Sequence, residues 1–120
     1  MAKWGSPVEI QTAIRMRLAA AAYAYEIDND PIISDEEFDH ACTLIDLRID
    51  TTRPDLDNYF REHFDKSTGM WIHKHPELHK VEEYLWRLRN PEEYRAQMEA
   101  DLARLKARLD DHLSNSDPSE

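Results

Sequence analysis

Glycine and cysteine are scarce in the sequence: of 120 residues, two are glycine and one is cysteine. The single cysteine, Cys42, cannot form a disulfide within the chain, which fits a reducing compartment. The longest apolar stretch, Leu18 to Tyr25, is far shorter than the ~20 residues of a spanning helix, and the start has no signal-peptide pattern. We therefore expect a cytoplasmic protein with no membrane role.

Motifs of catalytic and metal sites are also missing. No serine, cysteine or carboxylate group is paired with a base in a recognisable motif, so we expect no enzyme and no catalytic residue. Histidines at positions 63, 73, 75 and 79 have no cysteine partner and no His-Glu-x-x-His helix, and Pro76 biases His75 away from helical geometry. These histidines are expected to be ordinary surface residues rather than a metal site.

Acidic residues outnumber basic ones, giving a formal net charge of -10. The stretch from Glu26 to Asp57 holds eleven acids and only two bases, Arg48 and Arg53. A negative field repels phosphate backbones and attracts basic protein surfaces, so we expect no direct nucleic-acid binding and a protein partner. The alternative is that the acids serve solubility alone.

The residues that are abundant, Ala, Leu, Glu and Arg, favour helices, and no strand pattern is visible. Two capping boxes, Ser6 with Glu9 and Ser34 with Glu37, predict helices from Pro7 to about Glu26 and from 35 to 49. The apolar stripes expected to face inward are Ile10, Ile14, Leu18, Ala21 or Ala22 and Tyr25 on the first, and Phe38, Cys42, Ile45 and Ile49 on the second.

The second half of the chain predicts about three further helices. One follows Pro54, capped by Thr52 or Asp55, one runs from 76 to 89, and one from 91 to 113. Trp71, in an irregular segment, is expected to be a core plug rather than an exposed hot spot. The apolar stripe of the last helix either closes a bundle or joins two copies as a homodimer. We expect an all-α single domain over residues 1–113 and a disordered tail over 114–120.

One local motif resembles a known family. The residues Tyr25-Glu26, followed by Pro31-Ile32-Ile33-Ser34-Asp35-Glu36-Glu37-Phe38-Asp39, resemble the N-terminal Ia domain of NAD-dependent bacterial DNA ligases. The resemblance implies an antiparallel helical hairpin over residues 7–49, a lobe that in the ligases closes over the nicotinamide mononucleotide half of NAD. It implies cofactor-binding roles for Tyr25, Asp35, Phe38 and Asp39. The extension over 50–113 looks like that of small ligase-related proteins of phage or prophage origin.

The physical chemistry of these residue types is compatible with such a site. An aromatic ring at a helix end can stack on a flat ligand ring, while carboxylates of the next helix address a pyridinium or ribose hydroxyls. The sequence departs from the family where Phe38 lacks the hydroxyl of a tyrosine and where Glu26 replaces tyrosine or histidine. The alternative is that Tyr25 and Phe38 are core residues and that Ser34, Asp35 and Glu37 only cap a helix.

The ligase nucleophile, a lysine in Lys-x-Asp-Gly, has no counterpart, because Lys66-Ser67-Thr68-Gly69 carries threonine in place of the aspartate. We therefore expect a non-catalytic binding or regulatory protein, a phage or prophage accessory that binds NAD, nicotinamide mononucleotide or a nucleic-acid-processing protein. The alternative is an acidic nucleic-acid mimic that inhibits a host DNA-processing or defence protein, in the manner of an anti-CRISPR protein.

Overall fold

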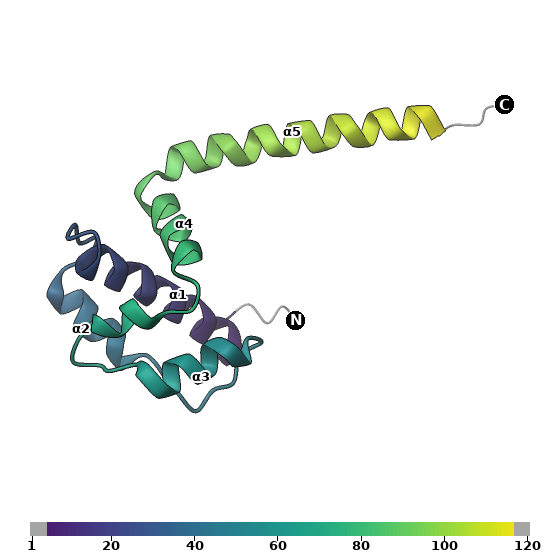
Figure 1. Ribbon diagram of the computed structural model, residues 1–120. Helices are drawn as coiled ribbons and strands as arrows, with labels where there is room; N and C mark the ends of the chain where they lie inside the picture. The colour runs from purple at the N-terminus through teal and green to yellow at the C-terminus, as the bar shows by residue number, and fades with distance from the viewer. Residues whose placement is uncertain (1–4, 117–120) are drawn as a thin grey trace. The chain divides into compact units, whose positions relative to one another are not determined.

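The computed structural model describes residues 5–116, with side chains as far as His112, and every regular element in that range is a helix. The predicted all-α fold class is confirmed. No helix among these residues is both long and apolar enough to span a membrane. The elements are α1 (Pro7–Glu26), α2 (Asp35–Thr43), α3 (Pro54–His63), the short 3-10 helix η1 (Met70–Lys74), α4 (Leu78–Arg89) and α5 (Pro91–Ser116) (Figure 1).

The chain divides into two compact units, residues 1–86 and 87–120. The first unit holds α1, α2, α3, η1 and most of α4, and the second holds α5. The single domain expected over residues 1–113 stays a prediction. Helix α5 continues to Ser116, beyond its expected end at 113, and the rest of the expected tail, 117–120, lies outside the described residues.

Both capping boxes form as predicted. The Glu9 backbone N–H donates to Ser6 Oγ at 3.2 Å, and the Glu9 carboxylate accepts from the Ser6 backbone N–H at 3.2 Å. The second box repeats this with Ser34 and Glu37, at 3.1 and 2.9 Å. Each box satisfies N–H groups that a helix start leaves without partners, so α1 and α2 begin where the local sequence specifies.

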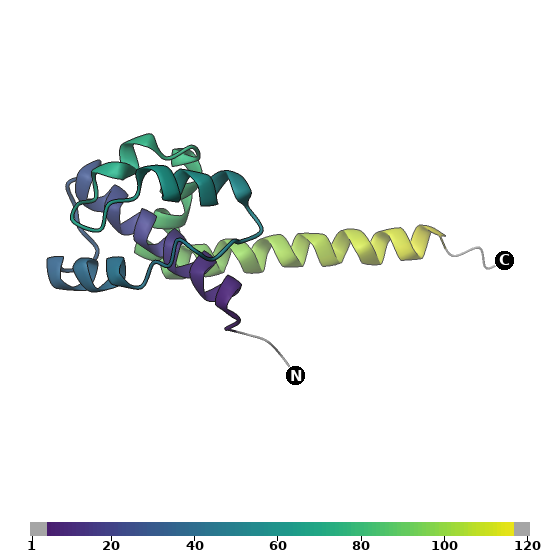
Figure 2. The ribbon, with the colours of Figure 1, turned by 90° about the horizontal axis from the view of Figure 1, so that it is seen from below.

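Helices α1 and α2 contact each other and run antiparallel, which confirms the predicted helical hairpin. Early in α1, the Gln11 side-chain amide donates to the carbonyl of Leu44, the residue after α2, at 2.8 Å. Near the end of α1, Ala22 shares a cavity with Phe38 from the first turn of α2. Figure 2 shows α1, α2, α3 and η1 gathered around one another.

Helix α2 ends at Thr43, not at Ile49 as expected. The segment that follows uses its backbone groups elsewhere: Asp46 N–H donates to the Gln11 side chain at 3.0 Å, and the carbonyls of Asp46 and Ile49 accept from Arg15 at 2.8 and 3.1 Å. Two polar side chains of α1 thus replace the i to i−4 bonds that would have continued α2.

These polar side chains make the buried face of α1 different from the predicted stripe. Ile10 is 45% exposed, whereas Arg15 is only 5% exposed. The Arg15 guanidinium donates to Asp57 Oδ1 at 2.8 Å, and Asp57 also accepts from the Thr51 backbone N–H and hydroxyl at 2.8 and 2.7 Å. This network joins α1 to α3, and the assignment of Ile10 to the core was wrong.

Aromatic side chains form the core beside this network. Trp71 is 4% exposed, and its ring centroid lies 5.4 Å from that of Phe60 and 5.5 Å from that of Phe64. The Tyr59 hydroxyl donates to the Trp71 carbonyl, which fixes η1 against α3. Trp71 is therefore a core plug, as predicted.

Two helix starts and one histidine differ from expectation. The residue that caps α3 is Arg53, which makes no side-chain capping bond, rather than Thr52 or Asp55. Helix α4 starts at Leu78 instead of Pro76, and just before it the backbone N–H of Glu77 donates to His75 Nδ1 at 3.0 Å. His75 is buried, so its placement among the surface histidines was wrong.

Candidate functional site

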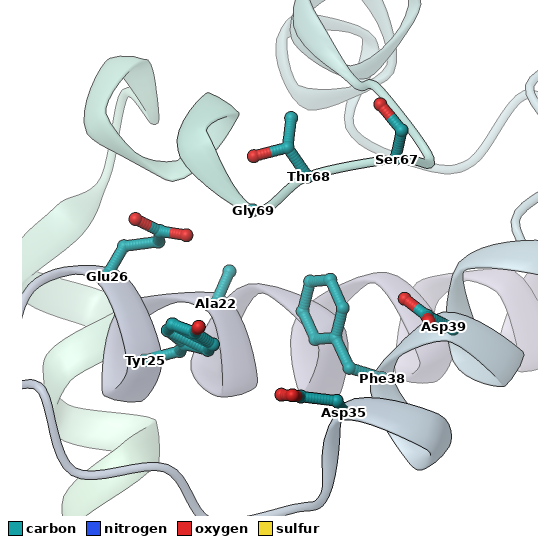
Figure 3. A pocket seen from close by; sticks show the side chains of 9 residues that line it. All are labelled: Ala22, Tyr25, Glu26, Asp35, Phe38, Asp39, Ser67, Thr68 and Gly69. Carbon is teal, nitrogen blue, oxygen red and sulfur yellow. The ribbon is translucent and has the colours of Figure 1, made fainter.

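A cavity of about 290 Å³ lies where the last turns of α1, the first turn of α2 and the loop before η1 meet (Figure 3). Helix α1 contributes one small residue, Ala22, to its lining, and the buried run from Ala19 to Ala22 lets neighbouring segments approach the helix closely. The residues that line the cavity are Ala22, Tyr25, Glu26, Asp35, Phe38, Asp39, Ser67, Thr68 and Gly69.

All four residues proposed from the sequence as a ligand site, Tyr25, Asp35, Phe38 and Asp39, line this cavity together. Tyr25 is 47% exposed, so the alternative that it is a core residue is wrong. Phe38 is half-buried and Asp35 and Asp39 are exposed. The antiparallel hairpin produces this grouping, since it brings the end of α1 beside the start of α2.

The charge of the cavity is negative. Glu26, Asp35 and Asp39 contribute three carboxylates, and none of the described lining residues is lysine, arginine or histidine. Close to the cavity, burial first, and then the charges of Asp39 and Asp65, raise the pKa of the Cys42 thiol to about 11. A thiol with that pKa stays protonated near neutral pH, as expected for an inert core cysteine.

The third wall of the cavity, Ser67 to Gly69, was not assigned to a site from the sequence. Asp65 holds this loop, because its Oδ1 accepts from the Ser67 backbone N–H at 2.9 Å and from the Ser67 hydroxyl at 2.7 Å. These hydrogen bonds lower the pKa of the Asp65 carboxyl. The signal that was available is the Asp-x-Ser pattern of a side-chain turn, followed by glycine.

Gly69 fits closely against the other two walls. A Cβ atom at this position would lie 3.3 Å from Phe38 Cζ, 3.4 Å from Glu26 Cγ and 3.5 Å from Ala22 Cβ. The first of these distances is tighter than ordinary van der Waals contact. A glycine therefore lets the loop close on the hairpin while the cavity stays open.

The arrangement provides rings and carboxylates for binding. Lys66 is exposed and is not one of the lining residues, and the Ser67 hydroxyl is donated to Asp65 rather than aimed at a base. Within the described part of the chain, no group of three His, Cys, Asp or Glu side chains could hold a metal ion. Comparisons of the chain with protein-family models, curated proteins and solved structures give no match.

Proposed function

We propose that the chain is a non-catalytic binding protein whose cavity takes a flat, positively charged group. The observation that carries the proposal is the meeting of two rings, Tyr25 and Phe38, with three carboxylates in a cavity lined by no cationic side chain among the described residues. Aromatic faces attract cations within about 6 Å of the ring centroid, and carboxylates add Coulomb attraction. The pyridinium ring of an oxidised nicotinamide nucleoside has both properties.

Electrostatics also ranks the possible nicotinamide ligands. A phosphate near Glu26, Asp35 or Asp39 is repelled by about 1–4 kcal/mol for each pair of unit charges 4 Å apart, depending on solvent exposure. Nicotinamide riboside, which has no phosphate, should therefore bind more tightly than nicotinamide mononucleotide or NAD. This order of affinities is opposite to the order expected of a site that binds the phosphates.

The size of the cavity supports a small ligand. Pockets for drug-sized ligands have volumes of roughly 300–1,000 Å³, and this cavity, at about 290 Å³, lies at the lower limit. It suits a ring with its sugar, and a dinucleotide would extend into solvent. Kinship with the ligase Ia domain stays a prediction, with which the antiparallel hairpin is compatible. A phage origin also stays a prediction.

Isothermal titration calorimetry with nicotinamide riboside, nicotinamide mononucleotide, NAD and neutral nicotinamide tests the proposal. We expect heat with the riboside, at least about tenfold weaker binding for each phosphorylated ligand, and weaker binding of neutral nicotinamide. Absence of heat with every pyridinium compound would overturn the proposed ligand. Incubation with labelled NAD should leave no label on Lys66, since the chain is proposed to bind without transfer chemistry.

Variants locate the binding site. Tyr25→Ala should abolish binding, and Asp39→Asn should weaken it, because each removes a lining group. Glu36→Gln is the matched control: Glu36 lies in the same turn of α2 and is exposed but does not line the cavity. Equal losses in Asp39→Asn and Glu36→Gln would indicate a general charge effect.

A second candidate is an acidic inhibitor that occupies a basic nucleic-acid groove of another protein. The exposed run of Asp35, Glu36 and Asp39 on one short helix favours it. Further along the acidic stretch, other carboxylates already bind arginines of the chain: Asp46 with Arg48, Asp50 with Arg61, Asp55 with Arg53 and Asp57 with Arg15.

The same control separates the two candidates. If the chain is a charge mimic, it should bind its partner protein less when Glu36→Gln is added to Asp35→Asn and Asp39→Asn. Its binding to the partner should also weaken as the salt concentration rises. The cavity proposal predicts that Glu36→Gln alone changes nothing. Salt-sensitive pull-down of nucleic-acid-processing proteins with these variants measures the difference.

A further inference from the structure

Helix α5 carries an apolar stripe that no other described segment of its own unit covers. The unit consists of residues 87–120, and α5 is its one long described helix. Met98, Leu102, Leu105 and Leu109 follow one another at steps of four, three and four, so they lie on one face, and all four are exposed, Leu102 by 59%. A run of this kind normally buries against another helix.

The spacing of the residues in the stripe, four, three and four, is the same in both directions. In two antiparallel copies centred between Leu102 and Leu105, each Met98 lies at the height of Leu109 of the other copy, and each Leu102 at the height of Leu105. The large side chain at each end therefore meets a large side chain, and no apolar position faces a polar one. An antiparallel pair of α5 helices is consequently in register along the whole exposed stripe.

The charges beside the stripe are complementary in the same register. At 100° per residue, Asp101 and Arg108 lie on one flank of the stripe, and Glu99 and Lys106 on the other. The Asp101 carboxylate also accepts from Arg104 of its own helix, and its exposed side chain leaves it open to a second cation. Antiparallel copies bring like flanks together, which places Asp101 beside Arg108 of the second copy, about 3 Å apart in height. Glu99 likewise lies beside Lys106 of the second copy. All four flanking positions then face an opposite charge.

A parallel pair is less well matched. It joins unlike flanks, so that Asp101 approaches Lys106 of the second copy but also lies beside its Glu99. Arg108 then lies beside Lys106, another like-charged neighbour. Like charges at such positions destabilise a helix pair and select against that orientation.

From this register and charge pattern, we infer that a second copy of the chain covers the stripe, forming an antiparallel homodimer through α5. The inference is independent of the ligand cavity, which lies in the other unit. The contact is small, with four apolar side chains from each copy, so a reversible dimer is expected rather than an obligate one.

Sedimentation equilibrium of the full chain between roughly 10 µM and 1 mM tests the dimer. We expect a monomer–dimer equilibrium in this range and at least about 100-fold weaker association for Leu102→Asp, with unchanged helix content by circular dichroism. A monomer at all concentrations, or a dimer that persists in Leu102→Asp, overturns the inference.

Charge reversal tests the orientation. Glu99→Lys should weaken the antiparallel dimer by about three- to tenfold, Lys106→Glu should do the same, and the double variant should restore association. In a parallel dimer Glu99→Lys would strengthen association, because it removes repulsion from Asp101. Failure of the double variant to recover, with both single variants still helical, overturns the antiparallel register.

Cross-linking gives a direct readout of the pairing. Mixed Met98→Cys and Leu109→Cys chains should form a disulfide between the two variants on mild oxidation, and each variant alone should form little. The buried Cys42 is left in place. Rapid disulfide formation by Met98→Cys alone would show a parallel pair and contradict the inference.

Discussion

Replacement of Asp57 by asparagine tests whether the buried ion pair holds α1 against α3. Arg15 donates to Gln11 Oε1, to Asp57 Oδ1 and to the carbonyls of Asp46 and Ile49, so the carboxylate is the one charged acceptor in this set. The side chains of Arg15 and Asp57 are 6% and 3% exposed. Asp57→Asn keeps the shape but leaves a buried guanidinium among neutral acceptors.

Loss of one partner of a buried pair costs about 3–5 kcal/mol, a large fraction of the ~5–15 kcal/mol that stabilises an ordinary domain. We expect Asp57→Asn to lower the free energy of unfolding by that amount in urea titrations followed by circular dichroism and tryptophan fluorescence. The control is Asp50→Asn. Asp50 pairs with Arg61 but its side chain is 80% exposed, so its loss should cost no more than about 1 kcal/mol.

The effect should depend on pH in a specific direction. Burial alone would raise the pKa of Asp57, but hydrogen bonds from Thr51 and the charges of Arg15 and Arg61 outweigh it and lower the pKa in the folded state. The stabilisation is therefore complete above the unfolded value of about 3.9 and is lost as the pH falls through the lower folded pKa. The difference between the parent chain and Asp57→Asn should be constant above about pH 5 and shrink in stronger acid.

The two partners should also be coupled. Arg15→Met and Asp57→Leu together should cost less than the sum of the single changes, because the double variant leaves no unpaired buried charge. If Asp57→Asn resembles Asp50→Asn, or if the single changes add, the pair does not stabilise the fold in the way argued.

Three further predictions concern other buried groups. Trp71→Ala should lower the free energy of unfolding by about 3–5 kcal/mol through the cavity it leaves, whereas the exposed neighbour Met70→Ala should change it little, both measured in urea. Cys42, with a pKa of about 11, should react slowly with a thiol reagent at pH 8 and quickly once urea unfolds the chain, and fast native reaction would contradict its burial. Burial lowers the pKa of His75; the charge of Glu77 opposes this shift and the charge of Arg53 adds to it. The contribution of His75 to stability is therefore complete above the unfolded pKa of about 6.5 and falls as the pH drops below that value. His75→Asn should flatten this part of the stability profile.

The elements that local sequence determines were predictable. The capping boxes at Ser6 and Ser34 place two helix starts correctly, because their hydrogen bonds span only three residues. The turn after α1 is also local, and Asn29, with φ of 54°, is its left-handed residue. The motif around Tyr25 and Phe38 also identified residues that the hairpin brings into one cavity.

The buried polar network was not predictable from periodicity. Gln11 and Arg15 are polar, so an apolar stripe search passes over them, and their partners lie 31 to 42 residues away in the chain. The same long-range bonds end α2 at Thr43. A helix boundary set by side chains of another helix has no local signal, which explains why the predicted end at 49 was wrong.

The third wall of the cavity, Ser67 to Gly69, also depends on contacts with residues far away in the sequence, which a local pattern does not reveal. Gly69→Ala tests the importance of this wall. The added Cβ would meet Phe38 Cζ at 3.3 Å, so the ring must move by a few tenths of an ångström. Because Phe38 is only half-buried, it can shift toward the cavity at modest cost to the fold, but that shift narrows the space for a ligand ring. We expect Gly69→Ala to change the urea midpoint little and to weaken binding of nicotinamide riboside at least tenfold, on the order of 1.4 kcal/mol. Unchanged affinity in a variant of parent-like stability would mean that the ligand does not occupy the space between the loop and the Phe38 ring.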